Sequence, residues 1–420
     1  MGRAQGPGGE EGRRELGPVR RVVVKLGSAL VVSESLGRLI DEMQAVRRGG
    51  VEVVIVTSGA VAAGMARLGL GARPAALAEV QALAALGQAA LMARYNEGFG
   101  RYDTACAQIL LTHEDLSHRG HFMNIRHAME AALRMGFVPV VNENDTVATE
   151  ELRFGDNDRL AAAISVVVGA DLVILLSDVD ALYDRDPRGD QGARPIREVG
   201  RIDEGIRAMA GAPRSAVGTG GMASKVAAAE LAVEAGIPLI VAPGAEVGVL
   251  ARILAGDAVG TRFLAAERRV GGRRHWIRYL SKVRGALHVD AGAAAALETR
   301  GGSLLAVGVR RVEGHFSRGD AVRIVDPEGR ELARGLAGYD SETAASLAGR
   351  HSHEVAERLG APAEPLVHRD DLQLVKARES KAAMGGSHPH PSGGPPGDGV
   401  DTARANTKMS RPQMGSEEET

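Results

Sequence analysis

Two lysines set among small residues are the groups in this sequence best suited to chemistry. Lys25 lies in the run VVVKLGS at residues 22–28, and Lys225 closes the run TGGMASK at residues 219–225. Between them in the sequence lies the acidic loop GDND at residues 155–158. A lysine beside glycine and serine can reach a phosphate that backbone N–H groups already hold. Two such lysines predict a phosphoryl group that is held from both sides.

The acidic loop precedes a helical pattern at residues 159–168. Carboxylates favour the start of a helix, so a capping role explains one acid. It does not explain two acids and an asparagine together. We therefore expect Asp158 to hold both lysine ammonium groups in place, and Asn157 to donate to, or accept from, a polar substrate.

Alternating strands and helices must position these groups. Most of the strand-like runs are continuous Val, Ile and Leu, which predicts burial on both faces and a parallel sheet. Repeated strand–helix–strand units predict a three-layer α/β sandwich with a mainly parallel central sheet. The predicted strands are 21–26, 52–57, 107–112, 138–142, 172–177 and 238–242, and the helical stretches include 75–97 and 120–134.

Polar loops follow several of the predicted strands. Ser58 follows the second strand, Asp145 the fourth, and Ser177 and Asp178 the fifth. Ligands of open α/β sheets bind beyond the carboxyl ends of the strands. Each residue alone is explained as a helix cap or a turn residue. Together with Lys25 they predict one ligand-binding rim.

Composition excludes several classes of function. The 420-residue chain has a net charge of −2 and 3% aromatic residues, so neither nucleic acid nor an acidic membrane is strongly attracted. The single cysteine, Cys106, excludes an internal disulfide framework and a cysteine-based zinc site, and it fits a reducing compartment. We see no secretory signal and no uncharged apolar run of membrane-spanning length, so a cytoplasmic protein is expected.

Competing ligand motifs are absent or out of place. The chain has no G-x-x-x-x-G-K-[ST] motif, which argues against a Walker-type site. Residues 218–223 fit G-x-G-x-x-A, but no apolar strand precedes them. Four histidines between residues 113 and 127 have spacings that do not place three on one helical face, so no protein metal site is expected.

The composition changes along the chain and suggests four regions. We expect a flexible extension at 1–18, the α/β domain at 19–268, a small β-rich domain at 283–362 and a disordered tail at 377–420. Short strand-like pieces around turn signals support the third region. Glycine, proline, serine, histidine and charged residues dominate the tail.

Six motifs, in order, resemble those of the glutamate 5-kinases of the amino acid kinase superfamily. The resemblance runs from residue 22 to residue 371 and covers both predicted domains. Residues 315–320, HFSRGD, resemble part of the PUA domain that ends bacterial members, which implies a small β-barrel-like fold there. The motifs are VVKLGS, VTSGAVAAG, PVVNENDTVA, FGDND, LSDVDALYDRDP and GTGGMASK.

The resemblance implies phosphorylation by ATP of the γ-carboxylate of L-glutamate, giving glutamyl 5-phosphate in the first step of proline synthesis. It implies Mg²⁺ with the nucleotide and no metal ligands from the protein. The implied catalytic residues are Lys25, Asp158 and Lys225, and the implied substrate-binding residues are Ser58, Asp145 and Asn157. The implied ATP-binding residues are Lys25, Ser177, Asp178, Thr219, Gly220, Gly221, Met222, Ala223, Ser224 and Lys225.

The resemblance also implies partners. Proline is expected as a feedback inhibitor, a glutamate-5-semialdehyde dehydrogenase as the consumer of the product, and a dimer or tetramer as the assembly. One alternative is a kinase for acetylglutamate or aspartate. The other is an RNA-binding protein that uses basic positions of the PUA-like domain, but acids interleave with them and make RNA an unfavoured partner. These basic positions are Arg310, Arg311, Arg318 and Arg323.

Overall fold

The computed structural model describes residues 16–148, 157–187, 189–190, 192–211, 221–265 and 281–375. The expected extension at 1–18 lies largely outside the described residues, and the tail at 377–420 lies wholly outside them. The described residues form two main sheets and a short ribbon of β6 (Leu182–Tyr183) and β7 (Pro195–Ile196).

The first main sheet has eight strands. Its neighbouring strands are parallel except for the antiparallel pair β9–β10, so the prediction of a mainly parallel sheet is confirmed. In sheet order the strands are β3 (Cys106–Leu111), β4 (Val138–Glu143), β2 (Glu52–Val56), β1 (Arg21–Leu26), β5 (Leu172–Ser177), β9 (Leu239–Pro243), β10 (Thr261–Phe263) and β8 (Glu198–Val199).

Strand β1 shows why its apolar run is continuous. Val22 and Val24 pack into one hydrophobic core, whereas Val23 packs into another on the opposite face. Successive strand residues point to opposite faces of a sheet, so a strand buried on both faces needs apolar residues at every position.

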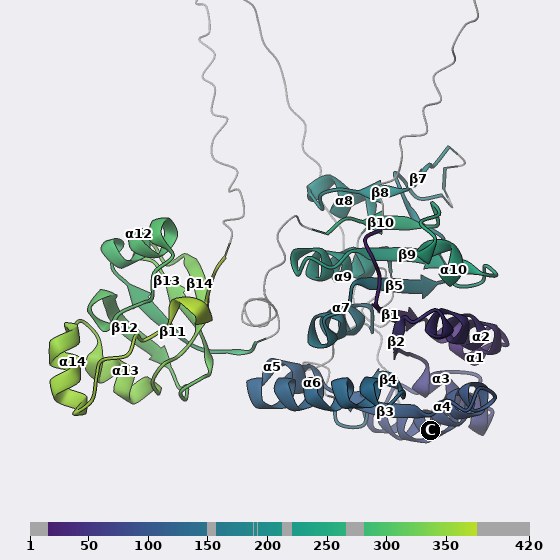
Figure 1. Ribbon diagram of the computed structural model, residues 1–420, viewed down its shortest axis with the longest axis horizontal. Helices are drawn as coiled ribbons and strands as arrows, with labels where there is room; N and C mark the ends of the chain where they lie inside the picture. Colours follow the sequence, from purple (N-terminus) through teal and green to yellow (C-terminus); the bar gives the residue numbers. More distant parts are fainter. Residues whose placement is uncertain are drawn as a thin grey trace, which may run out of the picture. The chain divides into compact units, whose positions relative to one another are not determined.

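Helices cover both faces of this sheet (Figure 1). Residues of α6, α7 and α9 share the core of Val23, and residues of α2, α4 and α10 share the core of Val22. The sandwich therefore has three layers, as predicted. The helices are α1 (Ser28–Val32), α2 (Ser35–Arg48), α3 (Ala60–Leu68), α4 (Leu77–Gly100), α5 (His113–Ser117), α6 (Arg119–Arg134), α7 (Asn157–Val168), α8 (Glu204–Met209), α9 (Met222–Glu234) and α10 (Val249–Leu254).

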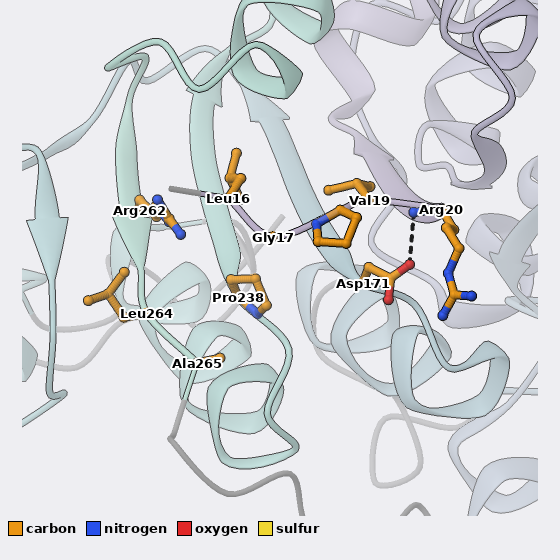
Figure 2. A pocket seen from close by; sticks show the side chains of 10 residues that line it. Leu16, Gly17, Val19, Arg20, Asp171, Pro238, Arg262, Leu264 and Ala265 are labelled. Carbon is orange, nitrogen blue, oxygen red and sulfur yellow. Dashed lines mark hydrogen bonds between the residues drawn. The ribbon is translucent and has the colours of Figure 1, made fainter. Parts of the chain in front are cut away.

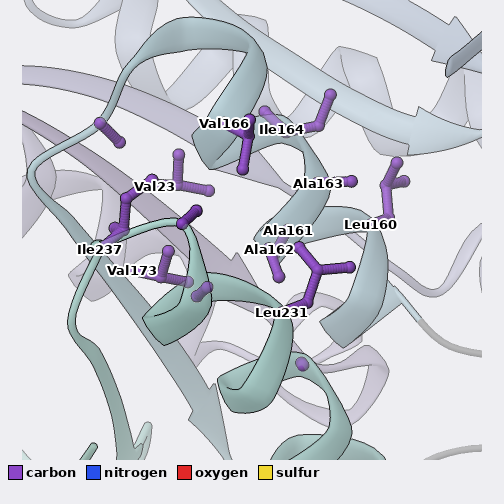
Figure 3. Packing of buried hydrophobic residues seen from close by; sticks show 14 of the residues in the cluster. Val23, Leu160, Ala161, Ala162, Ala163, Ile164, Val166, Val173, Leu231 and Ile237 are labelled. Atoms are coloured by element: carbon purple, nitrogen blue, oxygen red, sulfur yellow. The ribbon is translucent and has the colours of Figure 1, made fainter. Parts of the chain in front are cut away.

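Small side chains let α7 and α9 pack closely on each other. Ala161 and Ala162 of α7 are fully buried in the cluster that also holds Leu231 of α9 and Val23 of β1 (Figure 3). Alanine keeps helical propensity while allowing the backbones to approach. The first turns of α7 and α9 therefore meet at the end of β1, where the predicted ligand rim lies.

A separate cavity of about 570 Å³ lies at the amino ends of the central strands, at the other end of the strands from the lysine loops (Figure 2). Pro18, Asp171 and Pro238, which precede β1, β5 and β9, help to line it. The carboxylate of Asp171 accepts hydrogen bonds from the backbone N–H groups of Arg20 (2.9 Å) and Arg21 (3.1 Å). These hydrogen bonds hold the start of β1 next to the start of β5, at the amino ends of the strands.

The second main sheet is mixed. Strand β11 pairs in parallel with β13, and the other neighbours are antiparallel. Three helices accompany the sheet, which the sequence pattern predicted only as a small β-rich domain. In sheet order the strands are β12 (Val309–Gly314), β11 (Val283–Val289), β13 (Ala321–Val325), β14 (Glu331–Leu336) and β15 (Leu372–Leu374), and the helices are α12 (Ala291–Arg300), α13 (Ser341–Leu347) and α14 (Ser352–Leu359).

The HFSRGD segment forms the turn between β12 and β13. Phe316 is buried in the local core, and the carboxylate of Asp320 accepts a hydrogen bond from the backbone N–H of Ser317 at 2.8 Å. Gly319 has φ +91°, a value that suits glycine. Folding therefore accounts for most of this motif. Among the described residues of the chain, no helix is long and apolar enough to cross a membrane.

Candidate active site

Lys25, Asp158 and Lys225 meet in one buried cluster. The Nζ of Lys25 lies 2.6 Å from Oδ1 of Asp158, and the Nζ of Lys225 lies 2.9 Å from Oδ2. The exposed fractions are 5% for Lys25, 0% for Asp158 and 3% for Lys225. One carboxylate thus holds two ammonium groups, one on each oxygen.

The electrostatics of the cluster favour an ionised carboxylate. Burial raises the pKa of Asp158, but the charges and hydrogen bonds of Lys25 and Lys225 outweigh burial, so that the pKa lies below its ordinary value of 3.8. Within this cluster, two ammonium groups face one carboxylate, so the three residues together carry a net positive charge. An excess positive charge in a buried site suits an anionic ligand.

Local structure explains how each group arrives. Lys25 is next to last in β1, and Asp158 stands in the first turn of α7, where the helix dipole favours a carboxylate. Lys225 stands in the first turn of α9, where the same dipole disfavours a cation. Helix stability therefore does not explain Lys225, whose ammonium instead contacts Asp158.

Asn157 and Ser58 form a second polar cluster next to the first. The Nδ2 of Asn157 lies 2.9 Å from Oγ of Ser58 and 2.7 Å from the carbonyl oxygen of Thr57. Because Asn157 precedes Asp158 in the chain, a ligand that contacts this amide lies close to the lysines. The side chain of Ser58 does not cap α3, whose N-cap is Gly59.

A glycine turn and a close helix pair support Ser58. Gly59 has φ +96°, and a Cβ there would lie 3.4 Å from Ser28. A Cβ on Gly87 of α4 would lie 1.7 Å from the carbonyl oxygen of Ala60, so the backbones of α3 and α4 are in contact. The turn after β2 therefore lies against the start of α1, and the helix that follows it packs against α4.

Other predicted site residues follow their strands as expected from the topology. Asp145 is half-buried in a turn after β4. Ser177 is buried at the end of β5, and its hydroxyl lies 3.3 Å from both the N–H and the carbonyl oxygen of Val179. Asp178 is exposed. These positions are compatible with ligand binding.

The predicted nucleotide loop is described only in part. Thr219 and Gly220 lie outside the described residues. Gly221 is the N-cap of α9, and Met222, Ala223 and Ser224 form its first turn with half-buried side chains. The first turn of a helix offers backbone N–H groups to an anion.

Sequence reasoning left some supporting residues without a role. Gln88 of α4 and Asn142 of β4 are buried and joined by a hydrogen bond of 2.9 Å. The Tyr95 hydroxyl donates to Oγ1 of Thr57, the residue before Ser58, at 2.9 Å. A signal existed for Gln88, because it stands in the apolar stripe of α4 between Ala84 and Leu91.

The chain is similar to known protein families and to proteins of known function. Residues 20–243 match the amino acid kinase family, and residues 285–359 match the PUA domain. The glutamate 5-kinase of Chromohalobacter salexigens is 45% identical over 371 residues, which cover 86% of this chain and 98% of that protein. The glutamate 5-kinase of Thermus thermophilus is 48% identical over 362 residues, which cover 84% of this chain and 97% of that protein.

The similarity therefore spans nearly the whole of these relatives. The family match includes all three members of the lysine–aspartate cluster, Lys25, Asp158 and Lys225. The PUA match spans most of the second sheet. The chain belongs to the amino acid kinase family, among the glutamate 5-kinases that carry a C-terminal PUA domain.

Proposed function

We propose that the chain transfers the γ-phosphoryl group of ATP to the γ-carboxylate of L-glutamate. The product is glutamyl 5-phosphate, and the reaction is the first step of proline biosynthesis. Membership of the glutamate 5-kinases supports both substrates. The observation that carries the proposal is the buried pair of lysines on one carboxylate, which supplies excess positive charge beside the rim of the sheet.

The reaction requires charge stabilisation and positioning of the reactants more than it requires proton transfer. A carboxylate is already ionised near pH 7 and attacks phosphorus without a general base. The obstacles are repulsion between two anions and the charge that develops on the leaving oxygen. Lys25 and Lys225 would neutralise the transferring group, and Asp158 would hold both lysines in place.

The acceptor site is proposed beside this cluster. Asn157, Ser58 and Asp145 offer an amide, a hydroxyl and a carboxylate, which suit the polar groups of an amino acid. The contact between Asn157 and Ser58 supports a shared role for these two. The carboxylate of Asp145 suits the α-ammonium group of glutamate.

ATP is proposed to bind along Ser177, Asp178 and residues 219–225. The first turn of α9 supports this, because its backbone N–H groups can receive phosphate oxygens. The described residues contain no group of three His, Cys, Asp or Glu side chains that could hold a metal ion. They therefore do not form a cage for Mg²⁺, which would bind chiefly to the phosphates of ATP.

We further propose the regulation and assembly that the family suggests. Proline would inhibit at or near the glutamate site. A glutamate-5-semialdehyde dehydrogenase would consume the product, because acyl phosphates hydrolyse readily. The chain would form a dimer or tetramer, with domains at 19–268 and 283–362.

RNA binding through the second sheet is a weaker candidate. Arg310, Arg311 and Arg318 each form an ion pair, with Asp290, Glu313 and Glu364 respectively. Paired charges attract phosphates less than an unbroken basic stripe does. Titrating the full chain with a structured RNA at several salt concentrations tests this candidate, and tight binding with a steep salt dependence would favour it.

A substrate panel tests the proposed function. The wild-type protein is given ATP, magnesium and hydroxylamine together with L-glutamate, N-acetylglutamate or L-aspartate, and the acyl phosphate is trapped as a hydroxamate. We expect hydroxamate with L-glutamate and far less with the other two acids. Greater turnover with N-acetylglutamate or L-aspartate would instead assign the site to that acid.

A further inference from the structure

Three carboxamides form a continuous hydrogen-bonded chain that ends at Asn157 of the proposed glutamate site. The Nδ2 of Asn142 donates to Oε1 of Gln88 at 2.9 Å, and the Nδ2 of Asn157 donates to Oδ1 of Asn142 at 3.0 Å. Gln88 and Asn142 are 8% and 1% exposed. The chain thus runs from the interior of α4, through the end of β4, to the first residue of α7.

Backbone groups fix which end of each amide is nitrogen. The N–H of Glu143 can only donate, and it lies 2.9 Å from one end of the Asn142 amide, so that end is the oxygen. The nitrogen of Asn142 must then face Gln88, which has to present its own oxygen. The carbonyl of Thr57 can only accept, so the end of Asn157 that lies 2.7 Å from it is the nitrogen.

This orientation leaves a defined group for a ligand. Oδ1 of Asn157 and Nε2 of Gln88 are buried and have no hydrogen-bond partner among the described residues. A buried polar atom without a partner is unfavourable, so Oδ1 of Asn157 is suited to a donor that arrives with the ligand. An ammonium group fits this oxygen, whereas a carboxylate, which only accepts, does not.

We propose that Gln88 is a positioning residue of the substrate site. By accepting from Asn142, it holds in position an amide chain in which the Thr57 carbonyl turns the carbonyl oxygen of Asn157, and not its NH₂ group, toward the α-ammonium group of the substrate. The inference rests on the proposed use of glutamate. Gln88 lies on α4, which packs closely on α3, because the neighbouring Gly87 brings the α4 backbone against Ala60.

The Gln88→Met variant tests the proposal, because it keeps the side-chain length and removes the acceptor. We expect KM for glutamate to rise about five- to tenfold, the scale of one hydrogen bond. We expect kcat and KM for ATP to change less than about twofold, since the lysine–aspartate cluster is untouched. Equal rises in KM for glutamate and ATP, or an unchanged KM for glutamate, would overturn the proposal.

Gln44→Met is the matched control. Gln44 is also 8% exposed, and its Oε1 also accepts a hydrogen bond, from Arg47 at 2.8 Å, but it lies on α2. Its variant should leave KM for glutamate within about twofold of wild type, because its amide is not part of this chain. A rise equal to that of Gln88→Met would reduce Gln88 to a general folding role. Should the methionine variant not fold, Gln88→Leu and Gln44→Leu make the same comparison.

Two more variants separate positioning from other roles. Gln88→Glu keeps an oxygen for Asn142 and should raise KM for glutamate less than Gln88→Met does; an equal or larger rise contradicts the proposal. In an Asn157→Ala background, Gln88→Met should add less than about twofold to that KM, because nothing remains to be positioned. Multiplying effects would contradict the proposal. If the wild-type protein did not turn over glutamate at all, the proposed function itself would be overturned.

Discussion

Ion pairs occur at the lysine–aspartate cluster and across the second sheet, but their surroundings differ. Asp158 is 0% exposed, and both of its lysine partners are nearly buried. In the second region, the side chains of Arg318 and Glu364 are 70% and 57% exposed at a separation of 2.8 Å. The distances are similar, so burial is the difference that matters.

Burial thus distinguishes the charges of the proposed active site from the surface charges of the second region. Removing ions from water carries an energetic penalty that their attraction often fails to offset, so a buried pair is a weak source of stability. Exposed pairs contribute little either way. The placement of Lys225 at a helix start, against the dipole, adds to the expectation that the buried cluster serves a ligand.

The Asp158→Asn variant should have the largest effect on activity and stability. Asparagine offers one acceptor and one donor in place of two charged acceptors, so one lysine loses its partner inside the protein. We expect kcat to fall by about 10² or more, the scale of losing a preorganised group. Leaving a buried charge unpaired should also lower the free energy of unfolding by about 3–5 kcal/mol. Hydroxamate assays and denaturant unfolding measure the two effects, and wild-type values in both would contradict them.

Asn157→Ala should affect one substrate. The variant removes the amide of the proposed glutamate site and leaves the lysines in place, so KM for glutamate should rise about tenfold, while KM for ATP changes little. Steady-state kinetics with each substrate varied in turn provide the measurement. Equal rises in both constants would count against the proposed substrate contact.

The pH dependence of stability should also distinguish the buried cluster. Because the pKa of Asp158 is lowered in the folded protein, its contribution is complete above the ordinary value of 3.8 and is lost as the pH falls below it, through the lowered pKa. Denaturant unfolding between pH 6 and pH 3 (roughly the range over which carboxylates titrate) should show a loss in the wild type that is smaller in Asp158→Asn. Parallel curves would show that Asp158 is not the source.

The smallest effect is expected at the exposed pair. Arg318→Ala should leave kcat unchanged and alter the free energy of unfolding by less than about 1 kcal/mol, because solvent screens the charge. Thermal unfolding and the hydroxamate assay measure both. A large loss of activity would mean that the second region contributes directly to the reaction.

Much of the fold could be predicted from pattern alone. Val22, Val23 and Val24 require burial on both faces, and such runs identify the central strands to within about one residue. The short strands β8 and β10 were missed, because pairing with neighbours, and not an apolar run, defines two or three residues. Helix α12 of the second region was missed because it is largely alanine without a strong apolar stripe.

The site could be predicted less completely. Lys25 attracts notice because it interrupts an apolar run near the end of β1, and Asp158 and Lys225 do so because they are charged residues in the first turns of α7 and α9. Gln88 gives a weaker signal, because a single glutamine in the apolar stripe of an alanine- and leucine-rich helix indicates a buried polar group but not its partner. Its link to Asn142 depends on how α4 lies against β4, and only the tertiary structure supplies that.

One measurement tests the central claim most directly. The central claim is that the buried lysines stabilise the transferring phosphoryl group, whereas exposed charges do not. In the hydroxamate assay with saturating L-glutamate and ATP, Lys225→Ala should lower kcat by about 10² or more, the scale of losing one preorganised donor, while Arg318→Ala retains wild-type turnover. A folded Lys225→Ala protein with near-normal kcat would contradict the account.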